Sequence, residues 1–109
     1  MAYDEGLAQR IREALQGVPG LTEKKMFGGL AFLLRGNMVC GVVGEELMVR
    51  VGPGEYERSL SRPHARAMDF TGRPMKGFVY VSPEGFAEDE GLAQWVGLGV
   101  SYAGSLPGK

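Results

Sequence analysis

Apolar side chains near the start of the chain recur every three or four positions, with polar side chains between them. This pattern covers residues 7–18 and predicts an amphipathic helix with one buried face. Asp4 stands where an N-cap residue is expected, and the glycine and proline residues of 17–20 end the helix. A second pattern of this kind, over residues 92–103, follows the acidic residues 88–90 and predicts the last helix.

Between these helices the pattern changes to short apolar runs that are separated by turn residues. Residues 26–34 are apolar at both parities, which is typical of a strand covered on both faces. Gly28 and Gly29 within that run indicate a bulge or a close backbone approach. Turn composition follows at residues 35–37 and again at 44–46, so we expect a three-stranded antiparallel meander. Its predicted strands are residues 30–34, 38–43 and 47–51.

The second half of the chain adds a short helix and two more strands. We expect the helix at residues 55–60 and the strands at 67–70 and 76–81. The order of elements is then α-β-β-β-α-β-β-α, so the predicted class is α+β, with one antiparallel five-stranded sheet packed by helices. The residues predicted to form the core are Ile11, Leu15, Phe32, Val49, Phe78, Trp95 and Val96.

Composition limits the classes of protein that this chain can belong to. Its 109 residues, of which 44% are apolar, suit a single domain spanning 1–109. The net charge of −1 argues against a protein devoted wholly to nucleic acid. The chain begins without a signal-peptide pattern and has no apolar run long enough to span a membrane. A lone cysteine fits a reducing compartment, so we expect a cytoplasmic protein that does not enter a membrane.

Two side chains are candidates for catalysis, because each is the only one of its type. His64 follows the second predicted helix, and its surroundings in the sequence are typical of a loop. Cys40 lies inside an apolar strand, where cysteine is usually a small buried residue rather than a nucleophile. One histidine and one cysteine cannot fill a tetrahedral zinc site. We therefore expect no catalytic residue, no metal and no cofactor, and an enzyme is the least favoured of three interpretations.

Residues 62–76 are rich in cations: this segment contains four arginine or lysine residues and one acidic residue, Asp69. Four acids lie together farther on, between residues 84 and 90, so the charge is dipolar along the chain. The segment is a candidate site for an anion or an acidic partner, although its charges are more typical of a solvated loop and a sheet edge that is protected against aggregation. The predicted binding residues are Arg62, His64, Arg66, Arg73 and Lys76.

Phe78 and Tyr80 fall on the same parity of the last predicted strand, so they can share one face of the sheet. Aromatic side chains on a sheet beside cations are the pattern of a base-stacking surface. This pair is the nearest approach to that pattern in the sequence. Direct nucleic-acid binding is therefore kept as an alternative, although specific binding is not expected with so few cations.

Several short motifs in this order resemble the TfoX/Sxy N-terminal domain family of bacteria over nearly the whole chain. The motifs are MFGG at 26–29, FLL at 32–34, LMVR at 47–50, RPMKGF at 73–78 and the helix around Trp95. The resemblance implies an α-β(3)-α-β(2)-α fold and carries over no catalytic residue. It also implies a role like that of regulators of natural competence, which promote transcription of DNA-uptake genes together with a cyclic-AMP receptor protein. Those regulators typically carry a second, C-terminal domain, whereas this sequence stops at Lys109, so a stand-alone N-terminal domain is expected.

Together these observations predict a small regulatory or interaction module that acts through a protein partner, linked to transcriptional or competence regulation. The alternative function is weak binding of nucleic acid or a small anion by the surface of residues 62–76. The identity of the partner and the choice between monomer and homodimer stay open at this stage.

Overall fold

The computed structural model describes residues 3–26, 29–69 and 74–108, with the backbone alone at residues 26, 68–69 and 74–76. It contains three α-helices and a short 3-10 helix, η1. The helices are α1 (Glu5–Ala14), α2 (Tyr56–Leu60), η1 (Pro83–Phe86) and α3 (Asp89–Gly104). The strands are β1 (Leu21–Met26), β2 (Gly29–Leu34), β3 (Asn37–Val43), β4 (Glu46–Arg50), β5 (Ala65–Asp69) and β6 (Pro74–Val81). None of these helices is long and apolar enough to cross a membrane.

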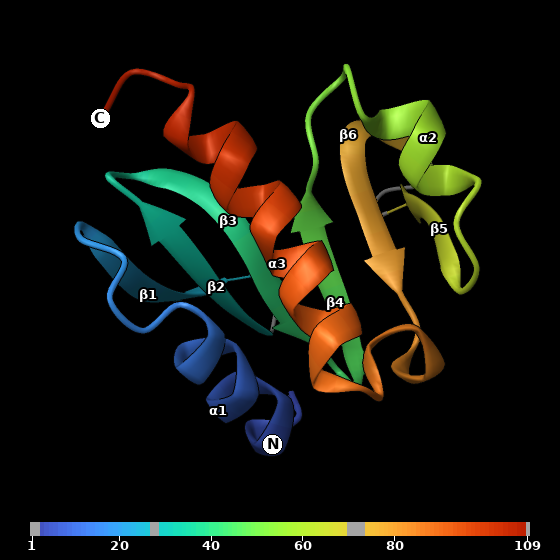
Figure 1. The fold of residues 1–109 in the computed structure, drawn as a ribbon, viewed down its shortest axis with the longest axis horizontal. Coiled ribbons are helices and arrows are strands. Elements are labelled where there is room, and N and C mark those ends of the chain that lie inside the picture. The colour runs from blue at the N-terminus through green and yellow to red at the C-terminus, as the bar shows by residue number, and fades with distance from the viewer. Residues whose placement is uncertain (1–2, 27–28, 70–73, 109) are drawn as a thin grey trace.

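All six strands form one antiparallel sheet in the order β1-β2-β3-β4-β6-β5 (Figure 1). The α+β class is confirmed, and five of the strands lie within two residues of their predicted bounds. The predicted count of five strands is wrong, because β1 forms an additional edge strand from a segment, LTEKKM, with few apolar residues. Glu23 on this strand pairs with Phe32, and its carboxylate accepts a hydrogen bond of 2.7 Å from Nε of Arg12 on α1.

The run expected to be one strand over residues 26–34 is divided between β1 and β2. Met26 ends the first strand and pairs with Gly29, which begins the second; residues 27 and 28 lie outside the described residues. The predicted close approach is present at Gly29, where a Cβ atom would overlap the backbone carbonyl of Val42. A side chain at this position would push β2 away from β3, so the sheet needs glycine there.

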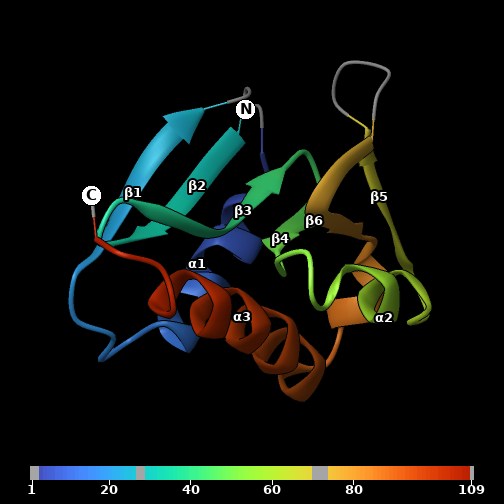
Figure 2. The ribbon, with the colours of Figure 1, turned by 90° about the horizontal axis from the view of Figure 1, so that it is seen from above.

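The helices lie on one face of the sheet, and Figure 2 shows α1, α2 and α3 together on that side. The core between the two layers contains a row of side chains that are in register across four central strands. Phe32, Cys40, Val49 and Val79 form this row, and all four are fully buried. At roughly 25 cal/mol per Å2 of apolar surface removed from water, this row contributes to the stability of the domain together with the side chains of α1 and α3 that pack against it.

Six of the seven predicted core residues are buried, with exposed fractions of 0–3%. The exception is Phe78, which is half-buried, so this part of the prediction is wrong. Val79 and Val81 occupy the positions of β6 that face the helices, and alternation along a strand then directs Phe78 to the other face.

Candidate functional site

The side of the sheet that faces away from α1, α2 and α3 is here called the open face. None of the helices in the described ranges covers it (Figure 2). Its half-buried apolar and aromatic side chains are Leu33, Met38, Val43, Phe78 and Tyr80. Its charged side chains are Lys24, Glu46, Arg50 and Arg66. Among the described residues, the open face therefore carries three cations against one carboxylate, on a chain whose net charge is −1.

Arg66 on β5 is held in place by two neighbours on the open face. Its guanidinium carbon lies 4.9 Å from the ring centroid of Tyr80, its register partner on β6. Both of its terminal nitrogens donate to the carboxylate of Glu46. The hydrogen bond to Glu46 raises the pKa of Arg66, and burial is the main cause of the raised pKa of the Tyr80 hydroxyl. Arg66 is thus already paired with a carboxylate of the same chain.

Arg50 at the end of β4 lies between two aromatic rings. Its guanidinium carbon is 5.6 Å from the centroid of Phe78, its register partner, and 5.2 Å from the centroid of Tyr102 on α3. Such contacts favour a cation, most strongly where water is partly excluded. Arg50 is half-buried, and no hydrogen bond or ion pair joins it to another described residue.

Arg62 and His64 lie on the helix side of the sheet, where they line a hollow of about 310 Å3 together with Glu84 and Trp95. The guanidinium carbon of Arg62 is 4.4 Å from the Trp95 ring centroid, and its Nη2 donates to Oε1 of Gln94 at 3.0 Å. His64 has a positive φ of 70°, which is uncommon for a residue other than glycine. Its carbonyl oxygen accepts a hydrogen bond of 2.9 Å from the backbone N–H of Ser82.

The five predicted binding residues are therefore placed in different surroundings. Arg62 and His64 share the hollow beside α3, whereas Arg66 lies on the open face, across the sheet from them. Lys76 is described only by its backbone within β6, and Arg73 lies outside the described residues. Binding of an anion or an acidic partner by this set stays a prediction. Sequence reasoning missed Arg50, because nothing in the local sequence indicates that Tyr102 comes to lie beside it.

Cys40 is a buried core residue, as its position in an apolar strand predicted. Burial raises the pKa of its thiol to about 12, so the thiolate form is disfavoured at neutral pH. Within the ranges that the structure describes, histidine, cysteine, aspartate and glutamate side chains form no group of three or more that could hold a metal ion.

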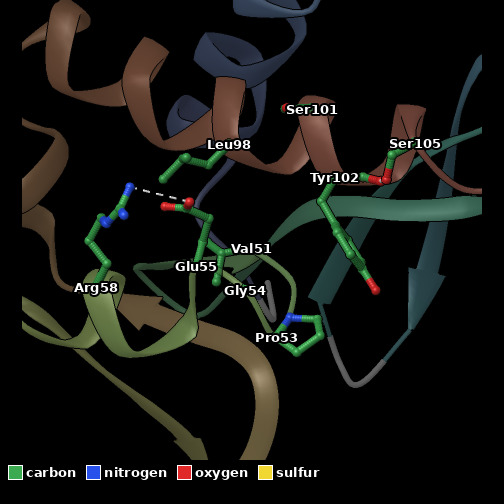
Figure 3. A pocket seen from close by; sticks show the side chains of 9 residues that line it. All are labelled: Val51, Pro53, Gly54, Glu55, Arg58, Leu98, Ser101, Tyr102 and Ser105. Atoms are coloured by element: carbon green, nitrogen blue, oxygen red, sulfur yellow. Dashed lines mark hydrogen bonds and ion pairs between the residues drawn. The ribbon is translucent and has the colours of Figure 1, made fainter.

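A second hollow, of about 600 Å3, lies between the start of α2 and the C-terminal half of α3 (Figure 3). Glu55 and Arg58 form an ion pair of 3.4 Å at its α2 side. In Figure 3 the Tyr102 side chain extends from α3 toward Pro53, and Ser101 and Ser105 lie on neighbouring parts of the same helix. Tyr102 thus lines this hollow and also contacts Arg50.

The fold and these surfaces define a small α+β domain in which three helices cover one face of a six-stranded sheet. A family model for the TfoX N-terminal domain matches residues 13–103, so the chain belongs to the TfoX N-terminal domain family. No curated protein and no solved structure is similar enough to the chain to be matched.

Proposed function

We propose that this chain is a cytoplasmic regulatory module that binds a protein partner through the open face. Membership of the TfoX N-terminal domain family supports a role in the transcriptional regulation of competence. The observation that carries the proposal is the open face itself, where apolar and aromatic side chains stand half-buried without a covering helix from the described chain. A sheet that lacks its second layer has apolar surface left to bury against another molecule.

The charge of the open face indicates what kind of partner it binds. Among the described residues, Lys24, Arg50 and Arg66 outnumber the carboxylate of Glu46, so the face attracts an acidic surface. Leu33 and Val43 add apolar contact area on the same face. The proposed occupant is therefore a protein that presents acidic residues among apolar ones.

Binding, rather than catalysis, is proposed for two reasons. Cys40 is fully buried in the core, and the raised pKa of its thiol is the opposite of what a nucleophile needs. His64 lies in a loop beside Arg62, and no cysteine or serine side chain donates to its ring among the described hydrogen bonds.

The proposal is tested by comparing capture by two variants with capture by the wild-type chain. Leu33→Asp places a negative charge on the open face, whereas Ala93→Asp adds the same charge on the exposed side of α3. We expect the wild type and Ala93→Asp to capture the same protein partner, and nuclease treatment should not reduce that capture. Leu33→Asp should fail to capture it. The purified partner should then bind Leu33→Asp about tenfold more weakly or worse. Equal capture by both variants would contradict the proposal, provided that circular dichroism shows both to be folded.

Binding of a small anion or of nucleic acid is the alternative function. Arg62 and His64 support it, because both line one hollow beside Trp95. In that case capture would be lost on nuclease treatment, or affinity would fall steeply with salt, with a slope near −0.9 for each duplex phosphate contacted. Arg62→Gln, rather than Leu33→Asp, would then be the variant that fails.

A further inference from the structure

We propose that Arg50 is the receptor for a carboxylate of the protein partner, which it binds on the open face at the end of β4. This inference rests on the proposed function and adds the residue that sets its specificity. Three observations carry it: the aromatic clamp around the guanidinium, the absence of a described acceptor for its N–H groups, and the half-buried apolar and aromatic side chains on the same face of the sheet.

The clamp fixes the guanidinium before any partner arrives. Phe78 is the register partner of Arg50 on β6, so one ring is supplied by the sheet itself. Tyr102 on α3 supplies the other ring. Strands β3 and β4 are paired only as far as Cys40 and Val49, and Arg50 follows this last pair. Tyr102 is itself held against the backbone of Gly52. A guanidinium fixed in this way loses little conformational entropy when it binds a planar carboxylate.

The other arginines that the structure describes are already in use. Each of them donates at least one hydrogen bond to a described carboxylate, amide or carbonyl oxygen: Arg10, Arg12, Arg35, Arg58, Arg62 and Arg66. Arg50 donates none within the described ranges, although it is half-buried and thus partly removed from water. A charge in that position gains more from an incoming counter-ion than a fully solvated one does. Two parallel N–H···O bonds to one carboxylate are the arrangement that a guanidinium favours.

A carboxylate fits this position better than a nucleic-acid backbone does. A phosphate chain needs several free cations in a row, whereas Arg66 on the same face is already paired with Glu46 and the whole chain is slightly acidic. A single acidic side chain can instead reach Arg50 while apolar residues beside it contact the half-buried rings of Phe78 and Tyr80 on the neighbouring strand β6. The preferred ligand is therefore an acidic residue within an apolar segment of a protein.

The test selects short random peptides, displayed on phage, for binding to the wild-type domain. We expect enriched peptides to share an aspartate or glutamate between apolar residues, and to bind Arg50→Gln about tenfold more weakly or worse. Arg50→Lys, which keeps the charge but loses the planar fork, should also bind weakly. Arg58→Gln is the matched control, because Arg58 is an exposed arginine on the helix side of the sheet.

Replacing the acidic residue of the peptide by its amide gives the decisive comparison. The amide peptide should bind the wild type weakly, and Arg50→Gln should distinguish little between the acid and the amide. The NMR signal of the Nε–H proton of Arg50 should also shift when the acidic peptide is added. A purely structural role of Arg50 would produce neither result, and unfolding of a variant is detected by circular dichroism.

The outcomes separate this inference from the proposed function. One outcome is that the enriched peptides fail to bind Leu33→Asp and yet bind Arg50→Gln as tightly as the wild type. That result would overturn the role of Arg50 and leave the proposed function standing. If no peptide is enriched on the open face, both proposals fail. If inorganic phosphate or a single-stranded oligonucleotide displaces the peptides and binds through Arg50 with comparable affinity, the site recognises phosphate and the carboxylate assignment is wrong.

Discussion

The ring of Tyr102 on α3 packs directly against the backbone of Gly52, with no room for a Cβ atom between them. Gly52 also has a positive φ of 86°. We therefore predict that Gly52→Ala lowers the free energy of unfolding by about 2–4 kcal/mol, through backbone strain and displacement of the ring. Urea denaturation measures this loss. Gly54→Ala is the control, because a Cβ at Gly54 meets nothing within 4 Å; equal effects of the two changes would contradict the prediction.

Two glycines of α3 should respond to alanine in opposite directions. A Cβ on Gly99 would overlap the carbonyl oxygen of Val39, whereas a Cβ on Gly97 points into open space. Gly97→Ala should stabilise the domain by about 0.5–1 kcal/mol, because alanine is the better helix former. Gly99→Ala should destabilise it by about 1–3 kcal/mol, since α3 has to move away from β3. The thermal midpoints of the two variants should therefore lie on opposite sides of the wild-type value.

Aromatic side chains on the two faces of the sheet should differ in their contribution to stability. Trp95 on α3 is 3% exposed between the helix and the sheet, so Trp95→Ala should cost about 3–5 kcal/mol through lost burial and the cavity that remains. Phe78 is only half-buried on the open face, so Phe78→Ala should cost about 1–2 kcal/mol. Guanidinium denaturation of both variants gives the comparison, and a larger loss for Phe78→Ala would show that the open face is covered.

The buried thiol of Cys40 should make the stability of the domain depend on pH in the alkaline range. Its pKa rises from 9.0 to about 12 on folding, so the unfolded chain releases this proton first. The contribution of the protonated thiol to the free energy of unfolding is complete below pH 9. It is lost as the pH rises toward about 12, at about 1.4 kcal/mol per pH unit.

Cys40→Ala isolates that contribution, because the other titrating groups are shared with the wild type. Between pH 8 and pH 10 the wild type should lose about 1.4 kcal/mol more than the variant, as measured by urea denaturation. Parallel losses in the two proteins would mean that the thiol ionises in the folded state as readily as in the unfolded chain.

The sequence predicts those strands whose apolar residues face the helices, and it misses β1. Glu23 and Lys25 of β1 pair with Phe32 and Leu30, whose side chains are in the core, yet both charged residues are exposed at the edge of the sheet. An edge strand can carry charges on both of its faces, and charges there also discourage pairing with another chain. The period-2 pattern of apolar residues is then lost, and the sequence no longer indicates a strand.

The candidate site could be predicted only in part, because the spacing of residues in the sequence does not show on which face of the sheet each side chain lies. Arg62 and Arg66 are four positions apart, but one lies against Trp95 and the other above Tyr80 across the sheet. The clamp around Arg50 depends on Tyr102, which is distant in sequence and reaches it through the packing of α3. Contacts of this kind come from tertiary structure, so local patterns contain no signal for them.

The position of α3 has a consequence for folding of the chain during its synthesis on the ribosome. This helix packs against β2, β3, β4 and α1, so it closes the core over strands from both halves of the sheet. Until residue 104 has been synthesised and has left the exit tunnel, the part of the apolar face over β2, β3 and β4 that α3 covers stays exposed. The emerging chain is then a ready substrate for chaperones and proteases, and the speed with which α3 docks determines how long that exposure lasts.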